Sequence, residues 1–167
     1  NSGLPGARRY MGQAAAYRLA WQLDRTMLDS YTDERNGLLD IRMTPQDLRK
    51  ACLAHLMALA DGGRPEAEEI FRRIGLHLGV VSREMDDLLH PGTGTRFLFG
   101  RFVKSPHCFT LLCEGFEGYE KNIRLEALDE NLARTPLMRQ LAERKDVTVA
   151  QFGQAIGAIY YAVCDRR

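Results

Sequence analysis

Apolar residues recur every three or four positions between Pro65 and His90. Such spacing predicts one helix of roughly 37 Å, because an α-helix rises about 1.5 Å per residue. Its apolar face consists of Ala67, Ile70, Ile74, Leu78, Val81, Met85 and Leu88. Two glycines four positions apart, Gly75 and Gly79, lie on the flank of that face. A glycine inside a helix costs about 1 kcal/mol relative to alanine, so the pair predicts that a neighbouring backbone packs closely there.

Three further helices are predicted from apolar spacing and from helix-start signals. The first covers about residues 6–28, and a polar loop follows it over residues 30–43. The second begins at Thr44, whose hydroxyl can cap the helix before a proline at the first helical position, and it runs to about Ala60. The last begins at Thr148 and carries both an apolar stripe and a face of small residues.

Two short segments have the pattern of β-strands. Residues 96–100 form an apolar, aromatic run with the length of a buried strand, and the run ends at a glycine. Residues 122–128 alternate apolar and polar side chains, as a half-buried strand does. Between the two segments, Ser105 and a following proline predict the start of a helix that continues to Phe116.

These elements predict a helix-rich α/β fold with a small sheet packed by long helices. We expect one domain over residues 1–167, with a helical segment over 1–90 and a strand–helix–strand–helix segment over 91–167. Two strands alone make at best a marginal sheet in water. Either a third strand lies in the ambiguous regions, or the two strands complete a sheet whose other members lie elsewhere.

Composition limits the partners that the chain can have. Of 167 residues, 45% are hydrophobic, which is enough for one core, and 23 basic residues nearly balance 22 acidic ones. A net charge of +1 predicts neither a nucleic-acid partner nor an anionic membrane surface. Every apolar run is shorter than the ~20 residues that a membrane span needs.

Four cysteines, Cys52, Cys108, Cys113 and Cys164, match no zinc spacing and no dense disulfide framework. We expect reduced thiols and a cytoplasmic protein. The chain opens with Asn1 rather than Met, without a signal-peptide pattern, which suggests a processed or truncated chain.

Histidines and acids form no motif for catalysis or for metal binding. His55, His77, His90 and His107 stand in no metal-binding couplet, so they are expected to be ordinary surface or packed histidines. His107 and Cys108 are adjacent, but neighbours on a helix point about 100° apart and do not face each other. Acids gather at both ends of the long helix, where we expect them to complement the helix dipole or to face solvent. They are Glu66, Glu68, Glu69, Glu84, Asp86 and Asp87.

The segment after the first predicted strand is the best candidate for a binding site. At Gly100 a backbone can approach a phosphate or a sugar without an intervening side chain. Arg101, Lys104 and Ser105 follow closely and would suit an anionic ligand. A tight strand-to-helix turn with solvated basic residues explains the same pattern equally well. The common phosphate-loop motifs do not occur in the sequence.

Taken in order, these motifs resemble the C-terminal half of ROK-family proteins, a family of repressors and sugar kinases within the actin-like ATPase fold. The likeness rests on residues 74–79, Ile-Gly-Leu-His-Leu-Gly, which match an I-G-x-x-L-G helix, and on the proline turn and apolar strand that end at Gly100. It extends to residues 153–158, Gly-Gln-Ala-Ile-Gly-Ala, and to the opening Ser2 and Gly3. The likeness covers most of the chain, although each motif is short.

In that family, nucleotide lies in a cleft between two halves, and the C-terminal half supplies glycine-rich turns. The resemblance therefore implies ATP with Mg²⁺ as ligand and Gly100, Arg101, Lys104 and Ser105 as the residues that bind it. Arg101 replaces the second glycine of the family pattern, which puts a side chain where bare backbone is expected. The guanidinium could instead pair with phosphate oxygens.

The resemblance also implies what this chain lacks. The family's catalytic aspartate lies in or just before the other half, and its zinc cluster has no counterpart here, so we expect no catalytic residue and no structural zinc. We therefore predict the nucleotide-side subdomain of an ATP-dependent, sugar-kinase-like phosphotransferase whose partner is a missing N-terminal half. The alternative is a noncatalytic interaction or regulatory module that forms a homodimer through its glycine-faced helices. DNA binding ranks last, because no helix-turn-helix is found.

Overall fold

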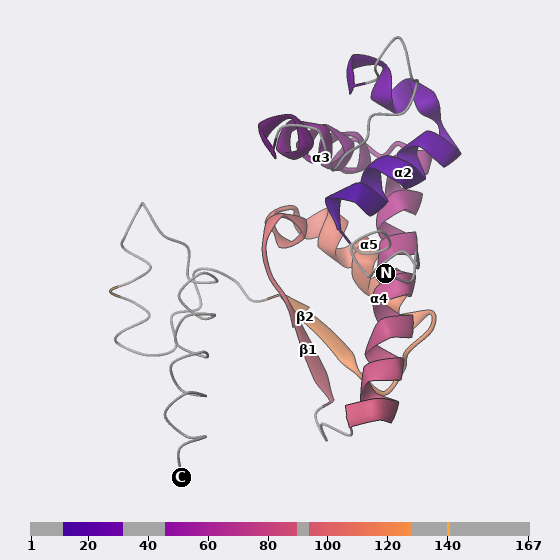
Figure 1. Cartoon of the computed structure of the whole chain (residues 1–167), viewed down its shortest axis with the longest axis vertical. Helices are drawn as coiled ribbons and strands as arrows, with labels where there is room; N and C mark the ends of the chain where they lie inside the picture. The colour runs from indigo at the N-terminus through magenta and orange to yellow at the C-terminus, as the bar shows by residue number, and fades with distance from the viewer. Residues whose placement is uncertain (1–11, 32–45, 90–93, 128–139, 141–167) are drawn as a thin grey trace, which may run out of the picture.

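The computed structural model describes residues 12–31, 46–89, 94–127 and 140. The predicted helix-rich α/β class is confirmed (Figure 1). In chain order the elements are α2 (Gln13–Leu23), the 3₁₀-helix η1 (Arg25–Tyr31), α3 (Gln46–Asp61), α4 (Pro65–Leu89), β1 (Thr95–Leu98), the 3₁₀-helix η2 (Arg101–Lys104), α5 (Pro106–Glu117) and β2 (Arg124–Ala127). None of the helices in these ranges combines the length and the apolar character needed to cross a membrane.

Helix α4 is the element on which the others pack, and its predicted bounds are confirmed. Glu66 and Glu68 lie in its first turn, where carboxylates complement the positive end of the helix dipole. Ala67, Ile70, Phe71 and Ile74 are fully buried and form the centre of the core. Helices α2 and α3 pack against α4 near its beginning, and α5 packs along its middle (Figure 1).

The glycines of α4 allow the close backbone contact that their spacing predicted. A Cβ on Gly75 would overlap the backbone carbonyl of Leu112 in α5. A Cβ on Gly79 would lie 3.1 Å from the carbonyl oxygen of Phe116, one helical turn further along α5. The glycine face of α4 is therefore occupied within the chain, so it cannot also serve as the homodimer interface. The other predicted glycine face, at Gly153 and Gly157, lies outside the described residues.

The strands and α5 form a β–α–β unit. Strands β1 and β2 are parallel, with Phe97 opposite Glu126 and Leu98 opposite Ala127. Leu98 packs against the hydrophobic core, and β2 contacts α5. Both predicted strands are confirmed, but each covers only four residues. They form a sheet of two strands within the described ranges.

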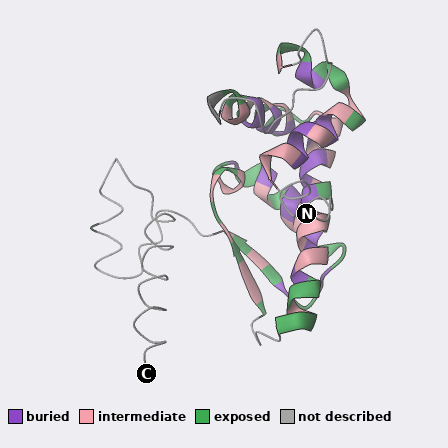
Figure 2. Cartoon of the chain, viewed as in Figure 1, coloured by how far each residue is buried: buried purple, intermediate pink, exposed green. Residues whose placement is uncertain are grey.

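The prediction that the first strand is buried is wrong. Phe97 and Phe99 keep 52% and 44% of their surface exposed. Figure 2 shows intermediate and exposed residues along both strands, in contrast to the buried residues of the helices. The reason is that, among the described residues, helices cover only one face of this sheet, so the side chains of the other face remain exposed. Composition alone does not distinguish this arrangement from a strand inside a larger sheet.

The first predicted helix is too long at its end, because α2 stops at Leu23. Asp24 follows in an extended conformation, and its carboxylate accepts hydrogen bonds from the backbone N–H and the hydroxyl of Thr26. An aspartate that binds nearby backbone groups competes with helix formation, and the chain continues as η1. Helix α3 ends where predicted, at Asp61. The loop predicted over 30–43 begins too early, because residues 30 and 31 belong to η1. Its remainder over 32–43, the capping Thr44 and the closing helix from Thr148 lie outside the described residues.

Candidate anion-binding turn

The turn that links β1 to α5 begins at Gly100, which has a φ of +97° and a ψ of −152°. Residues with a side chain rarely adopt this conformation, so the local sequence needs glycine here. A Cβ built on Gly100 would have no neighbouring atom within 4 Å. The backbone of the turn is therefore open on this side, and a ligand could approach it without displacing other groups.

Basic side chains follow Gly100 on the 3₁₀-helix η2. Arg101 and Lys104 are exposed, whereas Phe102 and Val103 between them are half-buried. The ring of Phe102 contacts that of Phe71 on α4 edge to face, with centroids 6.2 Å apart and planes at 78°. Such aromatic pairs are favourable beyond their burial, by about 0.5–1.5 kcal/mol. Phe102 therefore fixes η2 to the core, while the two cationic side chains extend into solvent.

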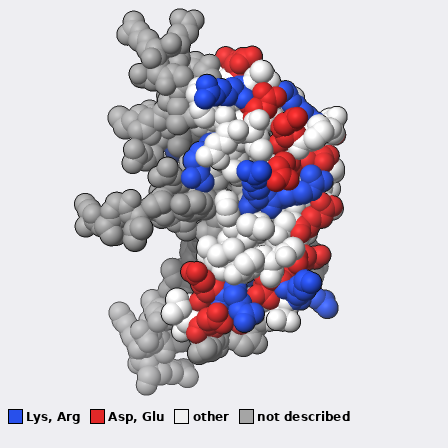
Figure 3. Space-filling view, turned by 90° about the vertical axis from the view of Figure 1, so that its right-hand side faces the viewer, with Lys and Arg blue, Asp and Glu red and all other residues white. Residues whose placement is uncertain are grey.

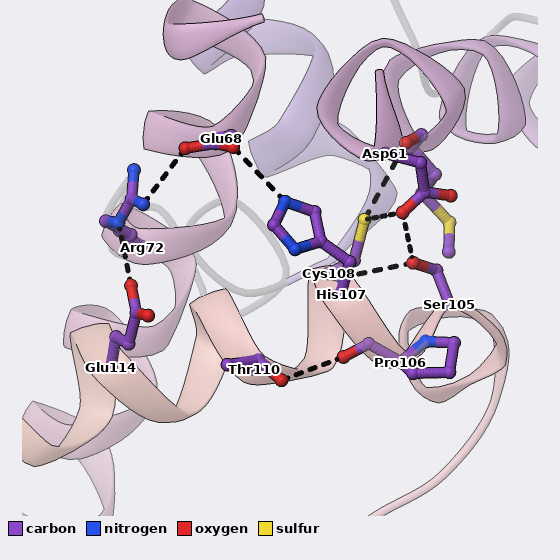
Figure 4. Close-up of polar contacts among 10 residues, drawn as sticks. Asp61, Glu68, Arg72, Ser105, Pro106, His107, Cys108, Thr110 and Glu114 are labelled. Carbon is purple, nitrogen blue, oxygen red and sulfur yellow. Dashed lines mark hydrogen bonds and ion pairs between the residues drawn. The ribbon is translucent and has the colours of Figure 1, made fainter. Parts of the chain in front are cut away.

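Ser105 has a different role from the other three predicted binding residues. It is buried, and its Oγ accepts a hydrogen bond of 3.0 Å from the backbone N–H of Cys108, which caps α5. The same hydroxyl donates a hydrogen bond of 2.5 Å to Asp61 Oδ1 at the end of α3 (Figure 4). Because both bonds lie within the protein, Ser105 positions the turn, and Gly100, Arg101 and Lys104 remain as the groups that face solvent.

The backbone groups at the beginning of α5 are also satisfied by partners within the chain. Pro106 has no N–H, and the N–H of Phe109 bonds to the carbonyl of Ser105. The Asp61 carboxylate lies at this end of the helix, where the dipole favours a negative charge. An external anion would compete with Asp61 at the helix terminus, so the accessible part of the site is the open turn before α5.

A chain of charged side chains joins α4 to α5 beside this turn (Figure 4). His107 Nε2 lies 3.2 Å from Glu68 Oε1, and Glu68 Oε2 lies 3.0 Å from Arg72. Arg72 also contacts Glu114 at 2.9 Å. The hydrogen bond from Arg72 is the main cause that lowers the pKa of Glu68. His107 thus contacts Glu68 at the surface and, as predicted, does not face the thiol of Cys108, which lies beside Met57 and Asp61.

The acids at the ends of α4 pair with arginines rather than with one another. Glu69 contacts Arg73, and Asp86 contacts Arg96 of β1 at 3.1 Å. A general base needs a carboxylate poised close to the reacting group, and these carboxylates are held by cations instead. The Glu69–Arg73 pair is local to α4, whereas the partner of Asp86 could not be identified from the sequence, because Arg96 lies on another element.

Cysteine chemistry does not contribute to the site. Cys108 is buried, and its thiol faces the carbonyl of Met57 and the carboxylate of Asp61, each at 3.8 Å. Burial raises the pKa of Cys108 to about 11. The thiol is therefore protonated near neutral pH, whereas a nucleophile must be a thiolate.

Charge on the described surface is mixed rather than segregated. Figure 3 shows acidic and basic side chains interspersed in two groups, with an uncharged area between them. In the sequence, α4 has no Lys, Arg, Asp or Glu between Arg73 and Arg83. No group of three or more His, Cys, Asp or Glu residues within the described ranges is placed to hold a metal ion.

Comparisons with known proteins add no relative. No family model matches the sequence, and no curated protein and no solved structure matches the chain.

Proposed function

We propose that the chain is the nucleotide-side subdomain of a two-part, sugar-kinase-like protein of the actin-like ATPase fold. In this proposal the turn at Gly100, Arg101 and Lys104 binds the phosphates of ATP together with Mg²⁺. The observation that supports it most is the open, positive-φ backbone of Gly100, which follows a parallel strand and precedes two exposed cations. In α/β sheets, ligands bind beyond the carboxyl ends of parallel strands.

Each residue has a defined part in phosphate binding. The bare Gly100 backbone admits a phosphate oxygen at close range. The guanidinium of Arg101 can donate two parallel hydrogen bonds to phosphate oxygens, while Lys104 supplies a point charge. Ser105 holds the turn against α3 through Asp61. Phosphoryl transfer needs a base that orients the acceptor hydroxyl, and in this proposal that base comes from the other half of the protein.

The sheet also supports a two-part protein. Purely parallel sheets occur almost only where helices cover both faces, and two-stranded ribbons are marginal in water. Strands β1 and β2 form a parallel pair, one face of which is not covered by any helix among the described residues. In our proposal the pair belongs to a larger sheet, to which the missing half contributes further strands.

Titration calorimetry of the full chain with ATP and Mg²⁺ tests the phosphate site. We expect Arg101→Ala combined with Lys104→Ala to weaken binding by at least about tenfold, since a hydrogen bond to a charged group is worth about 1.5–3 kcal/mol. The charge-matched control is Lys121→Ala combined with Arg124→Ala, at the opposite end of the strands. No heat from the unmutated chain at millimolar nucleotide would exclude the proposal.

Two glycine variants distinguish loss of ligand access to the turn backbone from loss of folding stability. Gly100→Val adds a side chain to the open turn, and Gly63→Val adds one to a second positive-φ glycine, with a φ of +79°, which follows α3 and is not part of the turn. Neither substitution meets a neighbouring atom within 4 Å at Cβ, so both strain only the backbone. We expect both to lose stability, and only Gly100→Val to lose nucleotide binding.

A noncatalytic interaction module is the second candidate, and the end of α4 favours it. Met85 and Leu89 continue the buried face of α4, yet they are 45% and 67% exposed, and Leu88 beside them is 78% exposed (Figure 2). Sedimentation equilibrium of Leu88→Asp tests it, with Leu76→Asp, at an exposed leucine nearer the middle of α4, as control. Self-association that only Leu88→Asp abolishes would support this candidate, and a monomer at all concentrations would exclude a homodimer.

A further inference from the structure

The exposed aromatic residues of β1 lie directly before the candidate turn. From residue 97 to residue 101, exposed side chains alternate with half-buried ones. Phe97, Phe99 and Arg101 are the exposed members, while Leu98 packs against the hydrophobic core. Because side chains of an extended segment point alternately to opposite faces, Phe97 and Phe99 share the face of the sheet that the helices do not cover.

This arrangement indicates what kind of ligand the turn accepts. A base stacks on an aromatic side chain through its flat face, and a phosphate needs cations and bare backbone. Phe99 immediately precedes Gly100, and Phe97 lies roughly 6.6 Å further back along the strand, at about 3.3 Å per residue. Exposed aromatic rings and the candidate anion-binding turn are thus adjacent along the chain.

We infer that Phe97 and Phe99 form a stacking surface for the base of the ligand, so that the site selects nucleotides over sugar phosphates and inorganic polyphosphates. The inference rests on the proposed phosphate site and names its ligand class. Phe97 supplies the central contact, because it is the more exposed ring and lies within the strand. Phe99 bridges the base and phosphate parts of the site.

The charges around the rings favour one orientation of the ligand. Glu126 is exposed and lies opposite Phe97 in the register of the sheet. Its carboxylate repels phosphate from the sheet face, whereas Arg101 and Lys104 attract phosphate to the turn. The base therefore lies over the rings, and the phosphates lie toward residues 100–104.

Calorimetry with two probes distinguishes stacking from phosphate binding. The full chain is titrated with Mg²⁺-ATP and with Mg²⁺-tripolyphosphate, which carries the phosphates without a base. Phe97→Ala and Phe99→Ala are expected to weaken ATP binding by roughly 5- to 150-fold, the range for loss of one base–aromatic stack, and to leave tripolyphosphate binding unchanged. Leu76→Ala, which truncates another large side chain that is 43% exposed, is the control and should change neither.

A fluorescent variant tests stacking in a protein that keeps an aromatic ring at this position, so that loss of binding through unfolding is not mistaken for loss of stacking. Phe97→Trp keeps the flat ring and adds an indole whose emission ATP should quench and tripolyphosphate should not. Equal binding of the two probes, with no effect of either alanine variant, would overturn the stacking inference and leave the phosphate site standing. If neither probe binds the unmutated chain, the phosphate site and the inference both fail.

Discussion

The backbone of Gly115 in α5 lies directly against the backbone carbonyl of Arg72 in α4, so closely that a Cβ on Gly115 would overlap it. One turn earlier in α5, the carbonyl of Leu112 lies in the same way against Gly75 of α4. In each helix a glycine thus lies against a backbone carbonyl of the other helix, and the two backbones cross without intervening side chains. Arg72 and Glu114 close the contact at the surface.

Substitution of these glycines should destabilise the protein although alanine favours helices. Ala adds about 1 kcal/mol of helix propensity, but overlap with a backbone carbonyl forces the helices apart and costs about 1–3 kcal/mol or more. We expect net losses of up to about 2 kcal/mol for Gly115→Ala and Gly75→Ala in urea unfolding followed by circular dichroism. Gly62→Ala is the control, because its Cβ would meet only ordinary contacts of 3.4 Å and 3.5 Å. A stability gain in Gly115→Ala would contradict the crossing geometry.

The sequence predicts the helices of the core well because their signals are local. The three- and four-residue spacing of α4 and the Ser105–Pro106 start of α5 are fixed by neighbouring positions alone. The presence of Gly75 also predicted its close contact, since a glycine inside a long helix costs stability that tight packing must offset. The partner of that contact, α5, could not be identified, because tertiary packing depends on residues distant in sequence.

Features of the candidate site that depend on tertiary context were not predictable. The exposure of Phe97 follows from the small number of strands and not from its own segment. The capping role of Ser105 was predicted, but its bond to Asp61 joins residues 44 positions apart. The same holds for Arg96, whose partner Asp86 lies on another element.

Ser105→Ala should weaken the junction between α3 and α5. The variant loses the helix cap at Cys108 and the hydrogen bond to Asp61, and loss of a cap alone costs about 1–2 kcal/mol. Chemical unfolding measures the loss. Thr110→Ala is the control, since its exposed hydroxyl bonds only to the carbonyl of Pro106 within α5, and its effect should stay within about 0.5 kcal/mol. Equal stability of the two variants would show that the Ser105 bonds contribute nothing.

Alkaline pH should destabilise the chain through its buried thiols. Burial raises the pKa of Cys52 from 9.0 to about 11. Between these two pH values the unfolded chain has lost the thiol proton and the folded chain keeps it, so the free energy of unfolding falls as pH rises. Urea unfolding between pH 8 and 11 should show a shallower fall in Cys52→Ala than in the unmodified chain. An identical slope in both proteins would rule out this thiol as a contributor.

At the acid end of the pH range, Asp24 should carry part of the stability. Hydrogen bonds from the hydroxyl and then the backbone N–H of Thr26 lower the pKa of Asp24 below 3.8, with a further contribution from Arg64. A carboxyl whose pKa is depressed by folding stabilises the protein above its unfolded pKa, and that stability is lost as the pH falls below about 4. In urea unfolding between pH 6 and pH 3, Asp24→Asn should therefore lose less stability on acidification than the unmodified chain does. The prediction fails if Asp24→Asn loses as much stability on acidification as the unmodified chain does.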